Sequence, residues 1–160
     1  MPADPKRELF RHTVSTLAYR AGKTLRGAPQ DFADFRVAEK TRTPAQILAH
    51  IGDLLDWVLS QAKGNEEWHN SKPLPWDKEV ARFFGALEAL DAYLASDAPL
   101  ASSAEKLFQG AIADALTHTG QLAMLRRLAG APVKGENYNR AHITTGRVGP
   151  DQPAPVREFD

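Results

Sequence analysis

Four segments of the chain place apolar residues at the i, i+3, i+4, i+7 spacing of an amphipathic helix, and almost nothing alternates with the period of a strand. These segments cover approximately residues 5–28, 43–64, 75–96 and 103–130. Their apolar stripes consist of Phe10, Val14, Leu17, Ala21 and Leu25; Ile47, Ile51, Leu54, Leu55 and Val58; Trp76, Val80, Phe83, Phe84, Leu87 and Leu94; and Leu107, Ala111, Leu122 and Leu125. Four such stripes predict an all-α fold, a four-helix bundle with the stripes facing inward. Two helical hairpins packed at steep angles would use the same stripes.

Signals for helix ends support this division. Thr43 is a capping residue directly before a proline at the first helical position, and Gly64 follows the last residue of the same segment. Ser102 or Ser103 is expected to cap the fourth helix. Between the second and third helices, residues 65–77 are polar and rich in proline, which predicts a surface loop.

The end of the chain differs in composition from the rest. We expect residues 1–132 to form the bundle, and residues 133–160, rich in glycine, proline and polar residues, to form a less regular tail that packs on the bundle or is partly mobile. Tyr138, Ile143 and Val148 supply more apolar anchors than a disordered tail needs. We therefore predict that at least residues 136–148 are ordered against the bundle.

Composition restricts the kind of partner. The 20 basic and 20 acidic residues cancel and give a sequence pI near 7.0, so no charge excess favours nucleic acid or an anionic membrane. There is no cysteine, so any metal must be bound by nitrogen and oxygen ligands. No apolar segment resembles a signal peptide or approaches the ~20 residues of a membrane span, and we expect a soluble, cytoplasmic protein.

Three polar side chains interrupt the apolar stripes. On a helical wheel, Asp114 and His118 lie on either side of the inward line of the fourth helix, and His50 lies within the apolar sector of the second. Burying a carboxylate or an imidazole is unfavourable unless a partner compensates it. A carboxylate and an imidazole four residues apart, with a third ligand from a facing helix, would form a metal site with open positions, which suits catalysis better than structure.

Simpler interpretations exist for each residue. Asp114 and His118 have the i, i+4 spacing of an ion pair within one helix. His50 alone has the features of a hydrogen-bonded core histidine. His69 falls in a predicted loop, where a solvated side chain is expected, and nothing in the sequence fixes the direction of His142, which would act as an extra ligand or a general base if it approached the site.

Two stretches, "TPAQILAHIGDLLDW" at residues 43–57 and "HTGQLAMLRRLAG" at residues 118–130, resemble the DinB-like superfamily of bacterial four-helix bundles. The resemblance covers roughly residues 5–132. In that superfamily a histidine near the start of the second helix and an H-x-x-x-H pair on the fourth bind a divalent metal. The resemblance places these ligands at His50, Asp114 and His118, where Asp114 departs from the pattern because the family has a histidine at that position.

A two-histidine, one-carboxylate set suits zinc, nickel, manganese or ferrous iron, of which zinc or nickel is the first expectation. Such a metal centre could lower the pKa of a bound water for hydrolysis of a small molecule, or activate an incoming thiolate for transfer. The resemblance favours the second, a metal-dependent S-transferase that uses a low-molecular-weight thiol. The alternative is a non-catalytic bundle, a binding or stress-associated dimer in which Asp114 and His118 form only a structural pair. The resemblance favours a homodimer, and so does a second apolar line on the fourth helix, Ile112, Leu116 and Ala123, if it is exposed.

Overall fold

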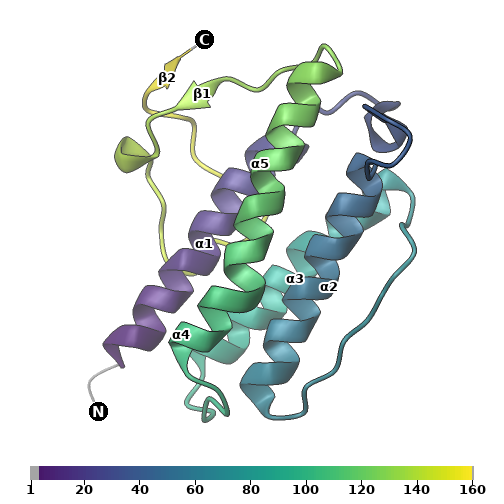
Figure 1. Ribbon diagram of the computed structural model, residues 1–160. Coiled ribbons are helices and arrows are strands. Elements are labelled where there is room, and N and C mark those ends of the chain that lie inside the picture. The colour runs from purple at the N-terminus through teal and green to yellow at the C-terminus, as the bar shows by residue number, and fades with distance from the viewer. Residues whose placement is uncertain (1–3, 160) are drawn as a thin grey trace.

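The computed structural model describes residues 4–159 and contains four long helical segments that lie side by side (Figure 1). The first three are α1 (Pro5–Leu25), α2 (Pro44–Lys63) and α3 (Trp76–Ala95). The fourth is composite, with α4 (Ala104–Leu107), the π-helix η2 (Phe108–Ile112) and α5 (Ala113–Leu128) in direct succession. The all-α four-helix bundle predicted from the sequence is confirmed.

Each long helix packs against two neighbours. α1 contacts α3 and α5, and α2 contacts the same two helices, so α1 and α2 lie on opposite corners of the bundle. The apolar stripes meet between them in one continuous core, whose largest fully buried side chains are Phe32, Phe83, Leu17, Leu48, Ile51, Leu55, Leu87, Leu90, Leu94, Leu107, Ile112 and Leu122. Phe32 reaches this core from the short 3₁₀-helix η1 (Phe32–Asp34) in the connection between α1 and α2.

The predicted helix ends are present in the structure. Thr43 and Gln46 form a capping box at the start of α2, and Gly64 ends that helix in the left-handed conformation with φ 81°. Ser103, rather than Ser102, caps the fourth segment, because its side chain accepts a hydrogen bond from the backbone N–H of Lys106.

The fourth helix departs from the sequence prediction at η2. A continuous α-helix was expected, but residues Phe108–Ile112 form a π-helical turn immediately before Asp114. A π-turn accommodates one residue more than a regular α-turn, so the residues after it no longer follow a wheel drawn at a constant angle. Leu122 and Leu125, which that wheel placed inward, are nevertheless buried in the core.

The C-terminal segment packs on the bundle. It contains a minimal antiparallel ribbon of β1 (Gly135–Glu136) and β2 (Glu158–Phe159), and the 3₁₀-helix η3 (Tyr138–Arg140). Glu136 is buried and accepts hydrogen bonds from Tyr19 and Lys23 of α1. Burial and the hydrogen bond to Glu136 raise the pKa of Tyr19, which keeps the phenol protonated as a donor. Val148 is buried in the core.

The apolar line proposed as a dimer face is not an exposed patch. Ile112 is fully buried in the core, and Leu116 packs against the same core with part of its surface covered. The π-turn that contains Ile112 turns this side chain inward. This line therefore gives no reason to expect a helical interface. Within residues 4–159, no helix combines the length and hydropathy needed to cross a lipid bilayer.

Candidate metal centre

The structure brings His50, Asp114 and His118 together at the contact between α2 and α5. Nε2 of His50 lies 3.3 Å from one carboxylate oxygen of Asp114, and Nε2 of His118 lies 3.4 Å from the other. The two imidazole rings are 4.8 Å apart between centroids and nearly perpendicular. One potential ligand atom from each residue lies within 4.8 Å of the other two.

Local structure explains why these side chains meet. His50 is on the second turn of α2, which the Thr43 capping box fixes at its start. Asp114 and His118 stand one turn apart at the beginning of α5, directly after η2, and both η2 and α5 pack against α2. Trp57 of α2 lies beside Gly110 of the π-turn, where a Cβ would be 3.7 Å from the indole ring, an ordinary contact distance. The packing of η2 and α5 against α2 therefore brings Asp114 and His118 to the side of His50.

A hydrogen bond to Gln121 fixes the state of the His118 ring. Nδ1 of His118 lies 2.7 Å from the side-chain oxygen of Gln121, which only accepts hydrogen bonds, so Nδ1 carries a proton. In the neutral ring, Nε2 then has a free lone pair, and this lone pair faces the carboxylate of Asp114. Outer partners of this kind orient metal-binding histidines and set their tautomer.

The spacing of the donor atoms fits a small divalent cation. Metal–ligand distances of about 2.1 Å in a tetrahedral site separate neighbouring ligand atoms by about 3.4 Å. The nitrogens of His50 and His118 lie 3.3 and 3.4 Å from different oxygens of Asp114, so each distance by itself is near this edge, and one ligand atom from each residue lies within 4.8 Å of the other two. Two neutral nitrogens and one carboxylate are ligands that divalent first-row metals accept. The residues present therefore fit a metal with at least one open position.

The site lies at the edge of the bundle and not in its core. The side chain of Asp114 is 45% exposed, whereas those of His50 and His118 are 21% and 12% exposed. The expectation that Asp114 points inward with the leucines is wrong, because nearly half of its side chain is open to solvent. Solvent and small molecules can reach the carboxylate side of the site, while the two imidazoles are held by packing.

The loop between α2 and α3 covers His50. Trp68 makes an edge-to-face contact with the His50 ring at 5.8 Å between centroids, and Trp57 makes a similar contact with Trp68 at 5.7 Å. Glu66 accepts a hydrogen bond from the indole N–H of Trp57. The loop predicted to lie on the surface thus supplies one wall of the site, and this role was not foreseen from the sequence.

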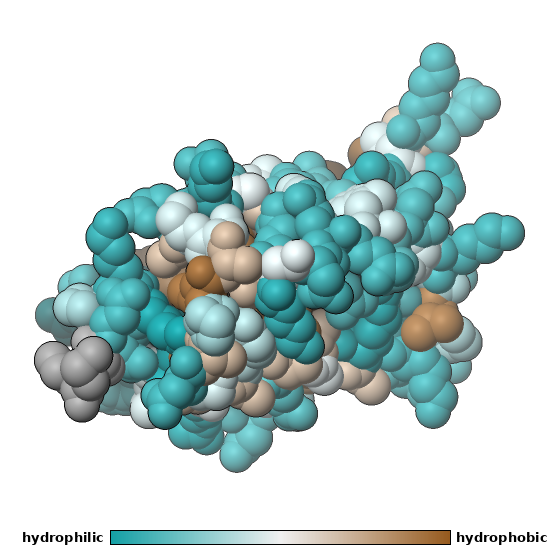
Figure 2. All heavy atoms as spheres, turned by 90° about the horizontal axis from the view of Figure 1, so that it is seen from below, coloured by the Kyte–Doolittle hydropathy of each residue, from teal (hydrophilic) through white to brown (hydrophobic). Residues whose placement is uncertain are grey.

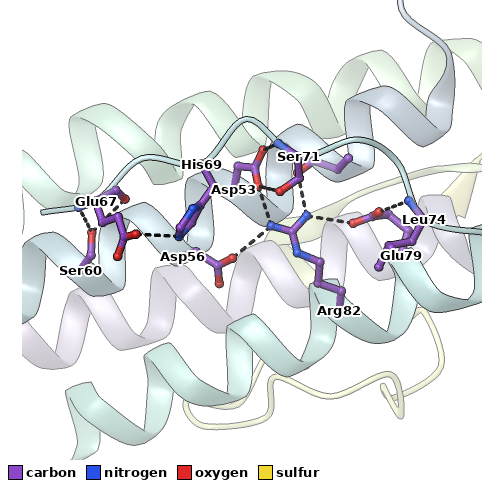
Figure 3. Close-up of polar contacts among 10 residues, drawn as sticks. Asp53, Asp56, Ser60, Glu67, His69, Ser71, Leu74, Glu79 and Arg82 are labelled. Carbon is purple, nitrogen blue, oxygen red and sulfur yellow. Dashed lines mark hydrogen bonds and ion pairs between the residues drawn. The ribbon is translucent and has the colours of Figure 1, made fainter.

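Arg82 of α3 pairs with the two carboxylates that hold the same loop on the bundle, Asp53 and Glu79 (Figure 3). Its guanidinium donates hydrogen bonds to Asp53 at 2.6 Å, Asp56 at 3.0 Å and Glu79 at 3.2 Å. Asp53 also accepts hydrogen bonds from the backbone N–H and the hydroxyl of Ser71.

The protonation of Asp53 reflects these contacts. Burial alone would raise the pKa of Asp53, but the hydrogen bonds from Ser71 and Arg82 outweigh it and hold this pKa below its ordinary value. Glu79 accepts a hydrogen bond from the backbone N–H of Leu74 in addition to that from Arg82, so the second half of the loop is attached to the bundle at both Ser71 and Leu74.

Two cavities adjoin the histidines. A polar cavity of about 360 Å³ is lined by His50 together with Arg42 and Lys72. An apolar cavity of about 440 Å³ is lined by His118 and is largely aliphatic, and Arg42 lines this cavity too. The triad therefore lies between two spaces of different chemistry.

A third hollow is separate from the site. It is apolar and lies between the start of α1 and α4, lined by Leu9, Phe10 and Phe108 among others. Figure 2, which views the molecule from below, shows apolar side chains gathered in a recess on this end.

The other histidines lie outside the triad. His69 is half exposed in the loop, close to Glu67, as expected for a solvated side chain. His142 is exposed in the C-terminal segment and is not part of the one cluster in residues 4–159 whose ligand atoms suit a metal. His12 is exposed on α1, and its Nδ1 lies 3.2 Å from the Thr145 hydroxyl.

Comparison with known proteins does not add to this geometry. No protein-family model, curated protein or solved structure matches the chain.

Proposed function

We propose that this chain is a DinB-like protein that binds one divalent metal ion through His50, Asp114 and His118, with zinc or nickel preferred over manganese or iron. One observation carries the proposal: two histidines from different helices face the two oxygens of one carboxylate, and one ligand atom from each of the three residues lies within 4.8 Å of the other two. The hydrogen bond from Nδ1 of His118 to Gln121 leaves Nε2 of the neutral His118 ring with a lone pair, which faces the carboxylate of Asp114.

We further propose an enzyme that acts on a small molecule, either as a transferase with a low-molecular-weight thiol or as a hydrolase. A bound cation would supply Lewis acidity, which favours deprotonation of a thiol or a water at the open position. The chain's own residues support this chemistry in distinct ways. Asp114 supplies negative charge on the exposed side, Gln121 orients His118, and Trp68 shields His50 from bulk water.

The competing function is a non-catalytic bundle in which the three residues form a structural cluster. Asp114 is within ion-pair distance of both histidines, so a protonated imidazole would also stabilise the arrangement. The two functions differ in metal content. A structural cluster contains no stoichiometric metal and is insensitive to a chelator, whereas a metal centre loses stability when the ion is removed.

Metal analysis of protein purified without a nickel column or a chelator tests the proposal. We expect about one zinc or nickel ion per chain, loss of most of it in His118→Ala, and retention with altered metal preference in Asp114→His. His12→Ala is the matched control, because it removes an exposed histidine outside the triad. A parent protein without metal, whose thermal unfolding is unchanged by zinc, nickel or a chelator, would refute the metal centre.

In that case the ion-pair interpretation makes its own prediction. His118→Ala then leaves the carboxylate of Asp114 without its partner on α5, and the half-exposed position limits the loss of stability to about 1 kcal/mol. Thermal melts of the parent, His118→Ala and His12→Ala with and without chelator distinguish the two outcomes.

A further inference from the structure

The polar cavity beside His50 is positively charged. Its one acidic lining residue, Asp53, is only 2% exposed, and its oxygens are already occupied by Arg82 and Ser71. Arg42 and Lys72 are the other charged side chains around this cavity, and both are exposed. Within residues 4–159, neither pairs with a carboxylate. The cavity therefore presents two free cations to whatever enters it.

The apolar cavity beside His118 has the opposite character. Val37 and Met124 are 50% and 57% exposed, and Ile47 and Leu125 also line the cavity. Arg42 and His118 are the residues of this lining with a basic group. Covering exposed aliphatic side chains with an apolar group is favourable at roughly 25 cal/mol for each Å² removed from water.

Arg42 joins the two cavities, because its side chain lines both. His50 lines the polar cavity and His118 the apolar one, and their rings are only 4.8 Å apart. A molecule of modest size can therefore place a charged group in the polar cavity and an apolar body in the other.

We propose that the site binds a small organic carboxylate with an apolar body. The carboxylate lies at Arg42 and Lys72, where it receives charge-assisted hydrogen bonds. The apolar body covers Val37, Ile47 and Met124. The proposal rests on the proposed function for the reactive role of the triad, but binding of the anion itself involves only side chains of this chain and does not require the metal.

Calorimetric titration of chelator-treated protein with octanoate tests this binding mode. Acetate has the charge without the apolar body, and 1-octanol has the body without the charge, so both should bind at least about tenfold more weakly than octanoate. Arg42→Met should weaken octanoate about tenfold and leave 1-octanol unchanged. Met124→Glu should weaken the binding of octanoate by a similar factor. It places a carboxylate, which has the same sign of charge as octanoate, in the apolar cavity.

Lys40→Met is the matched control for the charge, since Lys40 is exposed on the same connection but lines neither cavity. Lys72→Met is a second test of the cationic pair and should also weaken octanoate. Circular dichroism melts establish that each variant is folded. The proposal is overturned if octanoate gives no heat of binding, or if Lys40→Met weakens it as much as Arg42→Met does.

The two proposals fail independently. Protein without metal that binds octanoate through Arg42 would refute the metal centre and keep the anion site. If the protein contains one metal per chain but Arg42→Met leaves the affinity for octanoate unchanged, the metal centre is supported and the anion site is refuted.

Discussion

Replacing Arg82 by methionine should destabilise the protein strongly, because this cation joins α2, α3 and the loop over His50. Two of its partners, Asp53 and Glu79, have side chains that are 2% and 0% exposed. Breaking a buried pair costs about 3–5 kcal/mol. Asp53 keeps two hydrogen bonds from Ser71, and Glu79 keeps one from Leu74, so we expect the lower end, about 3 kcal/mol.

The melting temperature should fall by about 6–12 °C, since a domain of this size loses about 2–4 °C for each kcal/mol. The pH dependence gives a sharper test. In the parent, burial acts to raise the pKa of Asp53, but Ser71 and Arg82 hold it below its ordinary value. The resulting stabilisation is complete above the unfolded pKa of about 3.9 and is lost as the pH falls through the lower folded pKa.

In Arg82→Met the effect of burial is no longer opposed by the guanidinium, so the pKa of Asp53 should rise. A proton can then replace the lost cation, and the stability deficit relative to the parent should shrink as the pH is lowered from about 7 to about 4, close to the unfolded pKa. Thermal unfolding followed by circular dichroism at both pH values measures this. Arg127→Met removes an exposed arginine of α5 as a control. A fall of less than about 2 °C, or a deficit that does not change with pH, would refute the reasoning.

Three further changes test other parts of the structure. Tyr19→Phe removes the hydrogen bond to buried Glu136 and should cost about 1–2 kcal/mol and speed proteolysis of the C-terminal segment; an unchanged cleavage rate would contradict this. Gly64→Ala should cost about 1–2 kcal/mol in a denaturant titration, because φ is 81° and the new Cβ would lie 3.0 Å from Ala101. In its control, Gly120→Ala, the new Cβ has no neighbour within 4 Å, and the change should be neutral or stabilising. Trp68→Ala should leave the metal content unchanged but speed metal removal by a chelator, since it opens the wall beside His50; equal rates would argue against a shielding role.

The sequence predicts the local parts of this structure well. Apolar spacing identifies the four helical segments, and Thr43 and Gly64 mark the ends of α2, because caps depend on residues that are close in sequence. The residues of the triad were found because polar side chains in an apolar sector are conspicuous, and the resemblance joined His50 to the α5 pair. Whether a metal binds, which metal it is, and whether the protein is an enzyme stay predictions.

The rest of the site depends on contacts between segments that are distant in sequence. No pattern around Trp68 indicates that it packs on His50, 18 residues earlier. Nor does the sequence indicate that Arg82 of α3 bonds to Asp53 of α2. Arg42 lies in a connection without periodicity, so its position between two cavities follows only from the tertiary structure. The π-turn is not marked by proline, and it could not be read from a regular wheel.

The helical phase of α5 limits how the site can change by insertion and deletion. A π-turn accommodates one residue more than a regular α-helix, so removing one residue from Phe108–Ile112 would leave α5 close to its present rotation, whereas removing one from α5 itself would turn everything after the cut by about 100°. A cut between Asp114 and His118 would turn His118 away from His50, and it would also turn buried Leu122 out of the core. His118 and the core residues of α5 thus share one helical phase, so the length of α5 at this point cannot change without loss of the fold. Substitution at position 114 carries no such penalty, and we expect related chains to differ there while they keep the length of α5.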